Sequence, residues 1–139
     1  MLHAPVIAAP PPPAMAPAAF AAAAYLKLRR EAAGLSISQV ATTIAPKASR
    51  YAEALSLVTM LETDGVRARH TDTLIALHKA FPFDIVVYRQ LADDPADRHP
   101  TVCRGCGCSE WDPFRPRYAA EFCGWANSTT CTGCADLRA

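Results

Sequence analysis

The chain reads Cys103-Arg104-Gly105-Cys106-Gly107-Cys108 near its C-terminus, and all six of its cysteines lie within residues 103–134. The stretch closes with Cys131-Thr132-Gly133-Cys134. Two residues separate the cysteines of each outer pair, a spacing that lets both thiolates bind one ion. Glycine beside the cysteines permits the tight backbone turns that such a site needs. The pattern therefore predicts one tetrahedral Zn²⁺ site held by four cysteines: Cys103, Cys106, Cys131 and Cys134.

The two remaining cysteines, Cys108 and Cys123, leave alternatives open. Either could replace one of the four ligands, both could be buried thiols, or together they could help to hold a second ion. A disulfide framework and an iron–sulfur cluster are also consistent with six clustered cysteines. We favour zinc over disulfides because residues 1–25 lack the basic start and the unbroken apolar run of a secretion signal. This reasoning predicts a cytoplasmic protein.

Composition and charge indicate which kinds of partner the chain can bind. Residues 1–19 are rich in Ala and Pro, and we expect them to form a disordered arm. The chain has 139 residues, a net charge of +1 and no apolar run long enough to cross a membrane, so no membrane partner is expected. Residues 25–92 carry nine Lys/Arg against six Asp/Glu, whereas residues 93–139 carry five against seven. A basic surface is therefore expected in the first part.

Residues 20–94 are predicted to form a domain of short helices. The first helix should end near Ala33, because Gly34 follows where a left-handed residue commonly ends a helix. Ser36 and Gln39 match a capping box that starts a second helix of about nine residues, which Pro46 ends. Residues 45–54 are interpreted as a polar connection. Apolar spacing predicts a third helix from residue 55 to near Asp64-Gly65, and two more at residues 70–81 and 84–92.

Three segments of this helical part carry a resemblance to a known family. They are Leu28-Arg29-Arg30-Glu31-Ala32-Ala33-Gly34-Leu35-Ser36 leading into Val40-Ala41, then Val58-Thr59-Met60-Leu61-Glu62, and Leu74-Ile75-Ala76-Leu77 with Phe81 following. They resemble the lambda-repressor-like helix-turn-helix domain of the Xre/Cro family, over about half of the chain. In that family the second helix contacts the DNA backbone and the third enters the major groove. The resemblance implies a mainly α fold that binds double-stranded DNA.

The resemblance also implies which residues touch DNA. Ser56, Leu57 and Thr59 would face the bases, with Arg50 and Tyr51 just before them. Basic side chains would contact the phosphates, and the candidates are Lys47, Arg50, Arg67 and Arg69. An ordinary solvated surface is the alternative explanation of these four basic residues.

Residues 95–100 are polar and bounded by prolines, so we interpret them as a linker to a Cys-rich zinc module at residues 101–136. The module resembles Cys-rich tails of small phage and prophage proteins, which share its Cys-x-x-Cys-Gly-Cys start, a Cys-x-Trp step and a closing Cys-x-x-Cys. Its large apolar side chains are few, so we expect zinc to supply most of its folding free energy. The helical part is expected to fold unaided.

The sequence lacks the motifs of common enzyme sites. It has no glycine-rich phosphate loop, no nucleophile elbow and no carboxylate and histidine at a catalytic spacing, so we expect no enzymatic activity. The leading hypothesis is a DNA-binding transcriptional regulator of phage or mobile-element type with a structural zinc site. The alternative is an adaptor that holds a protein partner with its helical part or its zinc module. A homodimer is compatible with either hypothesis.

Overall fold

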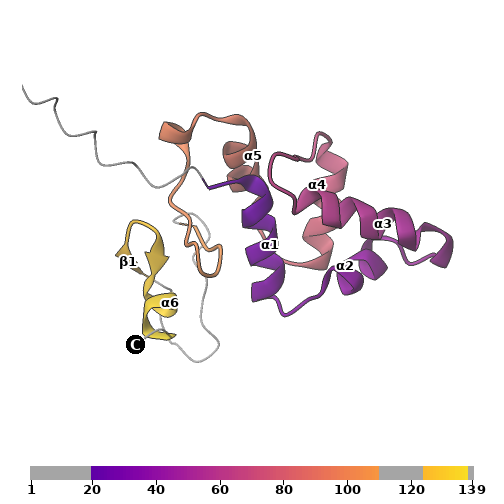
Figure 1. Cartoon of the computed structure of the whole chain (residues 1–139), viewed down its shortest axis with the longest axis horizontal. Coiled ribbons are helices and arrows are strands. Elements are labelled where there is room, and N and C mark those ends of the chain that lie inside the picture. The colour runs from indigo at the N-terminus through magenta and orange to yellow at the C-terminus, as the bar shows by residue number, and fades with distance from the viewer. Residues whose placement is uncertain (1–19, 110–123, 138–139) are drawn as a thin grey trace, which may run out of the picture.

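The protein is mainly helical, with a small cluster of cysteines near its C-terminus (Figure 1). The computed structural model describes residues 20–109 and 124–137. The predicted arm at residues 1–19, Cys123 and the middle of the predicted zinc module lie outside these ranges. The described helices come in the order α1 (Ala22–Ala32), α2 (Ile37–Ile44), α3 (Ala48–Leu61), α4 (Thr71–Ala80) and α5 (Ile85–Asp93). The 3₁₀ helix η1 (Ala96–Arg98), an antiparallel hairpin of β1 (Trp125–Asn127) and β2 (Thr130–Cys131), and α6 (Thr132–Leu137) follow.

Helices α1 to α5 enclose one apolar core. Its largest fully buried side chains are Tyr25, Tyr88, Leu26, Leu74 and Leu77. The two tyrosine hydroxyls also hold loops, because each accepts a backbone hydrogen bond: Tyr25 from the N–H of Asp84 at 2.9 Å, and Tyr88 from the N–H of Ala68 at 2.8 Å. Polar groups inside a core need such partners. Among the helices that the structure describes, none is both long and apolar enough to cross a membrane.

A buried ion pair joins α1 to the end of α3. The guanidinium of Arg30 donates to the carboxylate of Glu62 in three hydrogen bonds of 2.8, 2.9 and 3.1 Å, and to the carbonyl of Leu35 at 2.7 Å. Only 10% of the Arg30 side chain and 8% of the Glu62 side chain are exposed. The hydrogen bonds to Glu62 raise the pKa of Arg30. Because a forked contact fixes direction as well as distance, the pair sets how α3 lies against α1.

Local signals account for the start of α2 and the end of α1. The capping box of α2 is present: the Ser36 hydroxyl accepts from the N–H of Gln39 at 3.1 Å, and the Gln39 side chain accepts from the N–H of Ser36 at 2.8 Å. Gly34 has a φ of 74° just after α1, as its position predicts.

The start of α3 corrects the expectation drawn from the sequence. The prediction of a polar connection over residues 45–54 is wrong. Helix α3 begins at Ala48, and only residues 45–47 join it to α2. Residues 48–53 face solvent, apart from the half-buried Tyr51. They therefore lack the apolar stripe by which a helix is recognised in a sequence.

The first cysteine segment packs beside α1 (Figure 1). Val102, just before it, is buried in the same core as the five helices. Gly107, with a φ of 79°, lies so close to α1 that an added Cβ would be 3.0 Å from Cδ of Arg29 and 3.2 Å from Cβ of Leu28. The cysteines are therefore held against the helical part of the protein.

Candidate functional site

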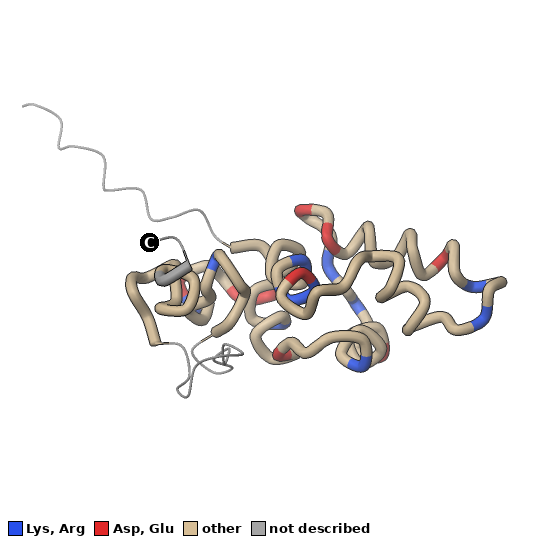
Figure 2. Tube along the Cα trace, turned by 90° about the horizontal axis from the view of Figure 1, so that it is seen from below, with Lys and Arg blue, Asp and Glu red and all other residues tan. Residues whose placement is uncertain are grey.

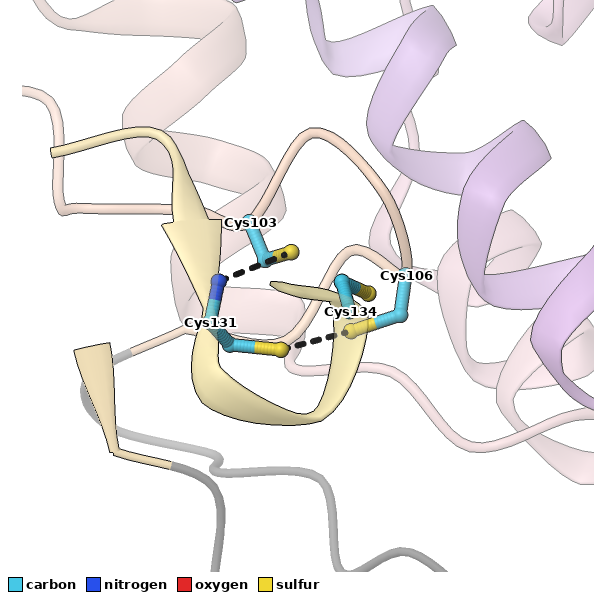
Figure 3. Close-up of side chains that lie close together, drawn as sticks. All are labelled: Cys103, Cys106, Cys131 and Cys134. Carbon is cyan, nitrogen blue, oxygen red and sulfur yellow. Dashed lines mark hydrogen bonds between the residues drawn. The ribbon is translucent and has the colours of Figure 1, made fainter. Parts of the chain in front are cut away.

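Four cysteine sulfurs converge beside α1 (Figure 3). The Sγ atoms of Cys103, Cys106, Cys131 and Cys134 all lie within 4.8 Å of one another, and those of Cys106 and Cys131 are 3.7 Å apart. Four sulfurs placed about 2.3 Å from one tetrahedral Zn²⁺ would be about 3.8 Å from each other. All four are free thiols. This group, which the spacing of the sequence predicts, could hold a metal ion.

The first pair of cysteines lies in a tight turn that its own backbone stabilises. The N–H of Gly107 donates to the carbonyl of Cys103 at 2.8 Å, and the N–H of Cys103 donates to the carbonyl of Cys108 at 2.7 Å. The N–H of Gly105 donates to Sγ of Cys103 at 3.3 Å. Gly105 has no room for a side chain, because an added Cβ would lie 2.8 Å from Sγ of Cys134. The turn thus directs both sulfurs of the pair to one centre.

The second pair comes from the hairpin and the helix after it. Cys131 is the last residue of β2, and Cys134 lies in the first turn of α6. Two hydrogen bonds join this half to the first: the N–H of Cys131 donates to Sγ of Cys103 at 3.3 Å, and the N–H of Arg104 donates to the carbonyl of Thr129 at 2.8 Å. Backbone contacts therefore hold the two halves of the centre together.

The thiols of the group differ in how readily they lose a proton. A hydrogen bond from the Cys108 thiol is the main reason that the pKa of Cys106 is lowered to about 5. Burial raises the pKa of Cys131 to about 11, and it also raises the pKa of Cys134. The pKa of Cys103 is lowered as well, because the effect of its burial is outweighed by hydrogen bonds from backbone N–H groups. Burial therefore opposes thiolates at Cys131 and Cys134 unless a positive charge compensates. A divalent metal ion supplies that charge and binds cysteine in its deprotonated form.

Cys108 is fully buried beside the group. Within the part of the chain that the structure describes, the converging group has four sulfurs, and Cys108 is not one of them. Its carbonyl and its thiol instead support the first pair, through Cys103 and Cys106. Cys108 therefore fits the buried-thiol alternative, and the role of Cys123 lies outside the described residues.

Three of the residues predicted to touch DNA gather where α2 turns into α3. Lys47 is the N-cap of α3, and Arg50 and Tyr51 follow in its first turn. Lys47 and Arg50 are exposed, and Figure 2 shows basic residues at this tip of the molecule. The hydroxyls of Tyr51 and Ser38 share a hydrogen bond of 2.7 Å, which holds the first turn of α3 against the first turn of α2. Sequence reasoning missed this contact, because nothing local marks two hydroxyls 13 positions apart as partners.

The other predicted DNA contacts lie farther along. Ser56 and Thr59 are exposed in the middle and the second half of α3, and Arg67 and Arg69 follow its end. Arg67 forms an ion pair of 2.6 Å with Asp93. Because α3 has 14 residues, it is about 21 Å long. The seven predicted residues are thus spread along α3 and beyond its end.

Sequence reasoning also missed an apolar surface between α3 and α4. Leu57 and Met60 are large apolar side chains that are 39% and 56% exposed. Leu57 lines two neighbouring hollows, one of about 340 Å³ with Ala76 and one of about 460 Å³ with Met60 and Val66. The spacing of two large apolar residues by three positions on an exposed helix face is the signal that could have found it.

Comparison of the chain with protein-family models, with curated proteins and with solved structures found no match. The site is therefore interpreted from its own geometry.

Proposed function

We propose that the protein binds double-stranded DNA through α2 and α3, which act as a lambda-repressor-like helix-turn-helix, and that it regulates transcription in a phage or mobile element. The observation that carries the proposal is the three-residue connection, residues 45–47, between α2 and α3. Helix-turn-helix motifs join their two helices by a turn of about three to four residues. The short connection supports the resemblance to a helix-turn-helix domain. A connection of ten residues would have weakened that resemblance.

The first turn of α3 is suited to a negatively charged partner. No side chain caps its N-terminus, so the positive end of the helix dipole is available to a phosphate. Lys47 and Arg50 add two exposed positive charges at the same end. The hydrogen bond between Ser38 and Tyr51 holds this end in place, as the ion pair of Glu62 holds the other. A helix fixed at both ends can enter a groove without losing further freedom.

We propose further that the ion at the four cysteines is Zn²⁺ and that its role is structural. Four cysteine ligands close the coordination sphere, whereas a catalytic zinc keeps one position open. Iron–sulfur clusters attach their cysteines to different iron atoms, and sulfurs that converge to 3.7 Å suit a single ion better. A closed site of this kind supports a function without catalysis.

Titration of a labelled DNA duplex with the purified full chain, at several salt concentrations, tests DNA binding. If basic side chains neutralise phosphates, the logarithm of the association constant falls linearly with the logarithm of the salt concentration, by about 0.9 for each phosphate contacted. Fragments of genomic DNA then supply the sequences among which preference is measured. No measurable affinity at moderate salt would reject the DNA proposal.

The apolar surface beside Leu57 and Met60 favours a second candidate function, in which the protein is an adaptor. Large apolar side chains exposed beside a hollow are typical of protein-binding surfaces, and these two line such hollows between α3 and α4. Sedimentation of the full chain and of its Met60→Lys variant tests whether this surface joins two copies. A homodimer that the variant abolishes, together with no DNA affinity, would favour the adaptor.

A further inference from the structure

The first cysteine segment belongs both to the metal centre and to the helical core. Cys103 and Cys106 supply two of the four converging sulfurs. On either side of them, Val102 is 6% exposed within the core of α1 to α5, and Gly107 lies so close to α1 that a Cβ there would be 3.0 Å from Cδ of Arg29. A change in the conformation of this segment therefore alters its packing against α1.

Two neighbouring arginines connect that contact to α3. The stem of Arg29 lies against Gly107, and its Nε donates to the carbonyl of Pro82, between α4 and α5, at 3.1 Å. The guanidinium of Arg30, the next residue, donates hydrogen bonds to the carboxylate of Glu62 at the end of α3. Both arginines are buried. One turn of α1 is thus packed between the cysteine segment and the helix proposed to enter DNA.

The cysteine segment also contacts the start of α1. The guanidinium carbon of Arg104 lies 5.8 Å from the centre of the Phe20 ring, a distance at which a cation is attracted to an aromatic face. The N–H of Arg104 meanwhile donates to Thr129, in the other half of the metal centre. The segment therefore contacts residues at both ends of α1, Phe20 just before it and Arg29 in its last turn.

We propose that the metal centre clamps α1, so that the stability of the helical core, and with it DNA affinity, depends on bound metal. The inference rests on the metal site and the DNA binding proposed above. An ion bound to all four sulfurs would tie the turn that presents Gly107 and Arg104 to α1 to the hairpin and α6, which supply the other two cysteines. Loss of the ion removes that link and loosens the turn against α1. A ligand that binds only the folded state stabilises whatever unfolds together with its site. The helical part, which its sequence alone predicts to fold unaided, would then gain part of its stability from the bound metal.

Thermal unfolding of the full chain tests the clamp. Far-ultraviolet circular dichroism follows it, because most described helical residues lie in α1 to α5. Elemental analysis of each sample, before and after treatment with a strong chelator, reports its metal content. We expect metal removal to lower the unfolding midpoint by about 5 °C or more, a shift readily resolved for a domain of this size. An unchanged midpoint after metal loss would overturn the clamp, whereas the proposal of a metal site would still stand.

Variants on α1 show whether the effect passes through this contact. Arg29→Ala removes the stem that touches Gly107, and we expect it to reduce the midpoint shift on metal removal to less than half. Arg29→Met keeps a similar stem and should preserve most of the shift. Lys27→Ala, at an exposed position of the same helix, is the matched control and should preserve all of it. Equal shifts in the Arg29→Ala and Lys27→Ala chains would overturn the clamp.

The same samples separate the clamp from the functions on which it rests. A chain that binds no metal would overturn both the metal site and the clamp. A metal-loaded chain without duplex affinity would reject DNA binding, yet its midpoint would still decide whether metal stabilises the helices. A metal-loaded chain whose duplex affinity does not fall on metal removal would overturn the link between the clamp and DNA.

Discussion

Gly105 is the residue at which the metal centre has least room. An added methyl group would lie 2.8 Å from Sγ of Cys134 and 3.1 Å from its Cβ. We therefore expect Gly105→Ala to weaken metal binding by about 10- to 100-fold, the range measured when groups that orient metal ligands are changed. Competition with a chromogenic chelator measures the affinity. Gly124→Ala is the control, because a Cβ there would approach no atom closer than 3.7 Å, and equal affinities in both variants would contradict this account.

Glu62 is the residue on which the position of α3 depends most. Removing its charge leaves the Arg30 guanidinium buried without its partner, and breaking a buried pair in this way costs about 3 to 5 kcal/mol. Glu62→Gln should therefore lower the free energy of unfolding by about that amount, as urea denaturation measures. Glu31→Gln removes a carboxylate that is 49% exposed and 3.9 Å from the same guanidinium, and it should have little effect. Similar losses in both variants would show that burial of the pair is unimportant.

At the scale of helices, the sequence predicts those boundaries that short-range chemistry sets. Ser36 and Gln39 mark the start of α2, since a capping box is a contact between residues three positions apart. The start of α3 escapes prediction, because residues 48–53 bury little and their helix is stabilised from outside, in part by the hydrogen bond between Tyr51 and Ser38. Contacts between helices thus determine those helix boundaries that local sequence patterns do not predict.

The N-terminal end of α3 should dominate its contact with DNA. Arg50→Ala should weaken binding to all duplexes by the same factor and reduce the salt slope by about 1, as the loss of a phosphate contact predicts. Arg67→Ala should change the slope less, because Arg67 already pairs with Asp93 at 2.6 Å and donates to the carbonyl of Ala92 at 3.2 Å. Ser56 and Thr59 substitutions should instead alter sequence preference. A larger slope change for Arg67→Ala than for Arg50→Ala would contradict the assignment.

At the scale of the whole molecule, the metal centre and the tip formed by α2 and α3 lie on opposite sides of α1 (Figure 1). The convergence of the four cysteines could be predicted from the sequence, because each pair is set by short spacing. The packing of the metal loop on α1 could not, because Gly107 and Arg29 meet only once the chain has folded back over 78 residues. An influence of the metal on DNA binding would therefore pass through α1 and through the core that buries Val102.

The central claim, a single ion held by four cysteine sulfurs, is tested most directly by X-ray absorption at the metal edge of the purified full chain. We expect a zinc edge and a first shell of four sulfurs at about 2.3 Å, with no second metal beside it. The spacing of 3.7 Å between Sγ of Cys106 and Sγ of Cys131 already suits that shell. An iron edge with iron neighbours, or a zinc shell in which nitrogen or oxygen replaces sulfur, would contradict the claim.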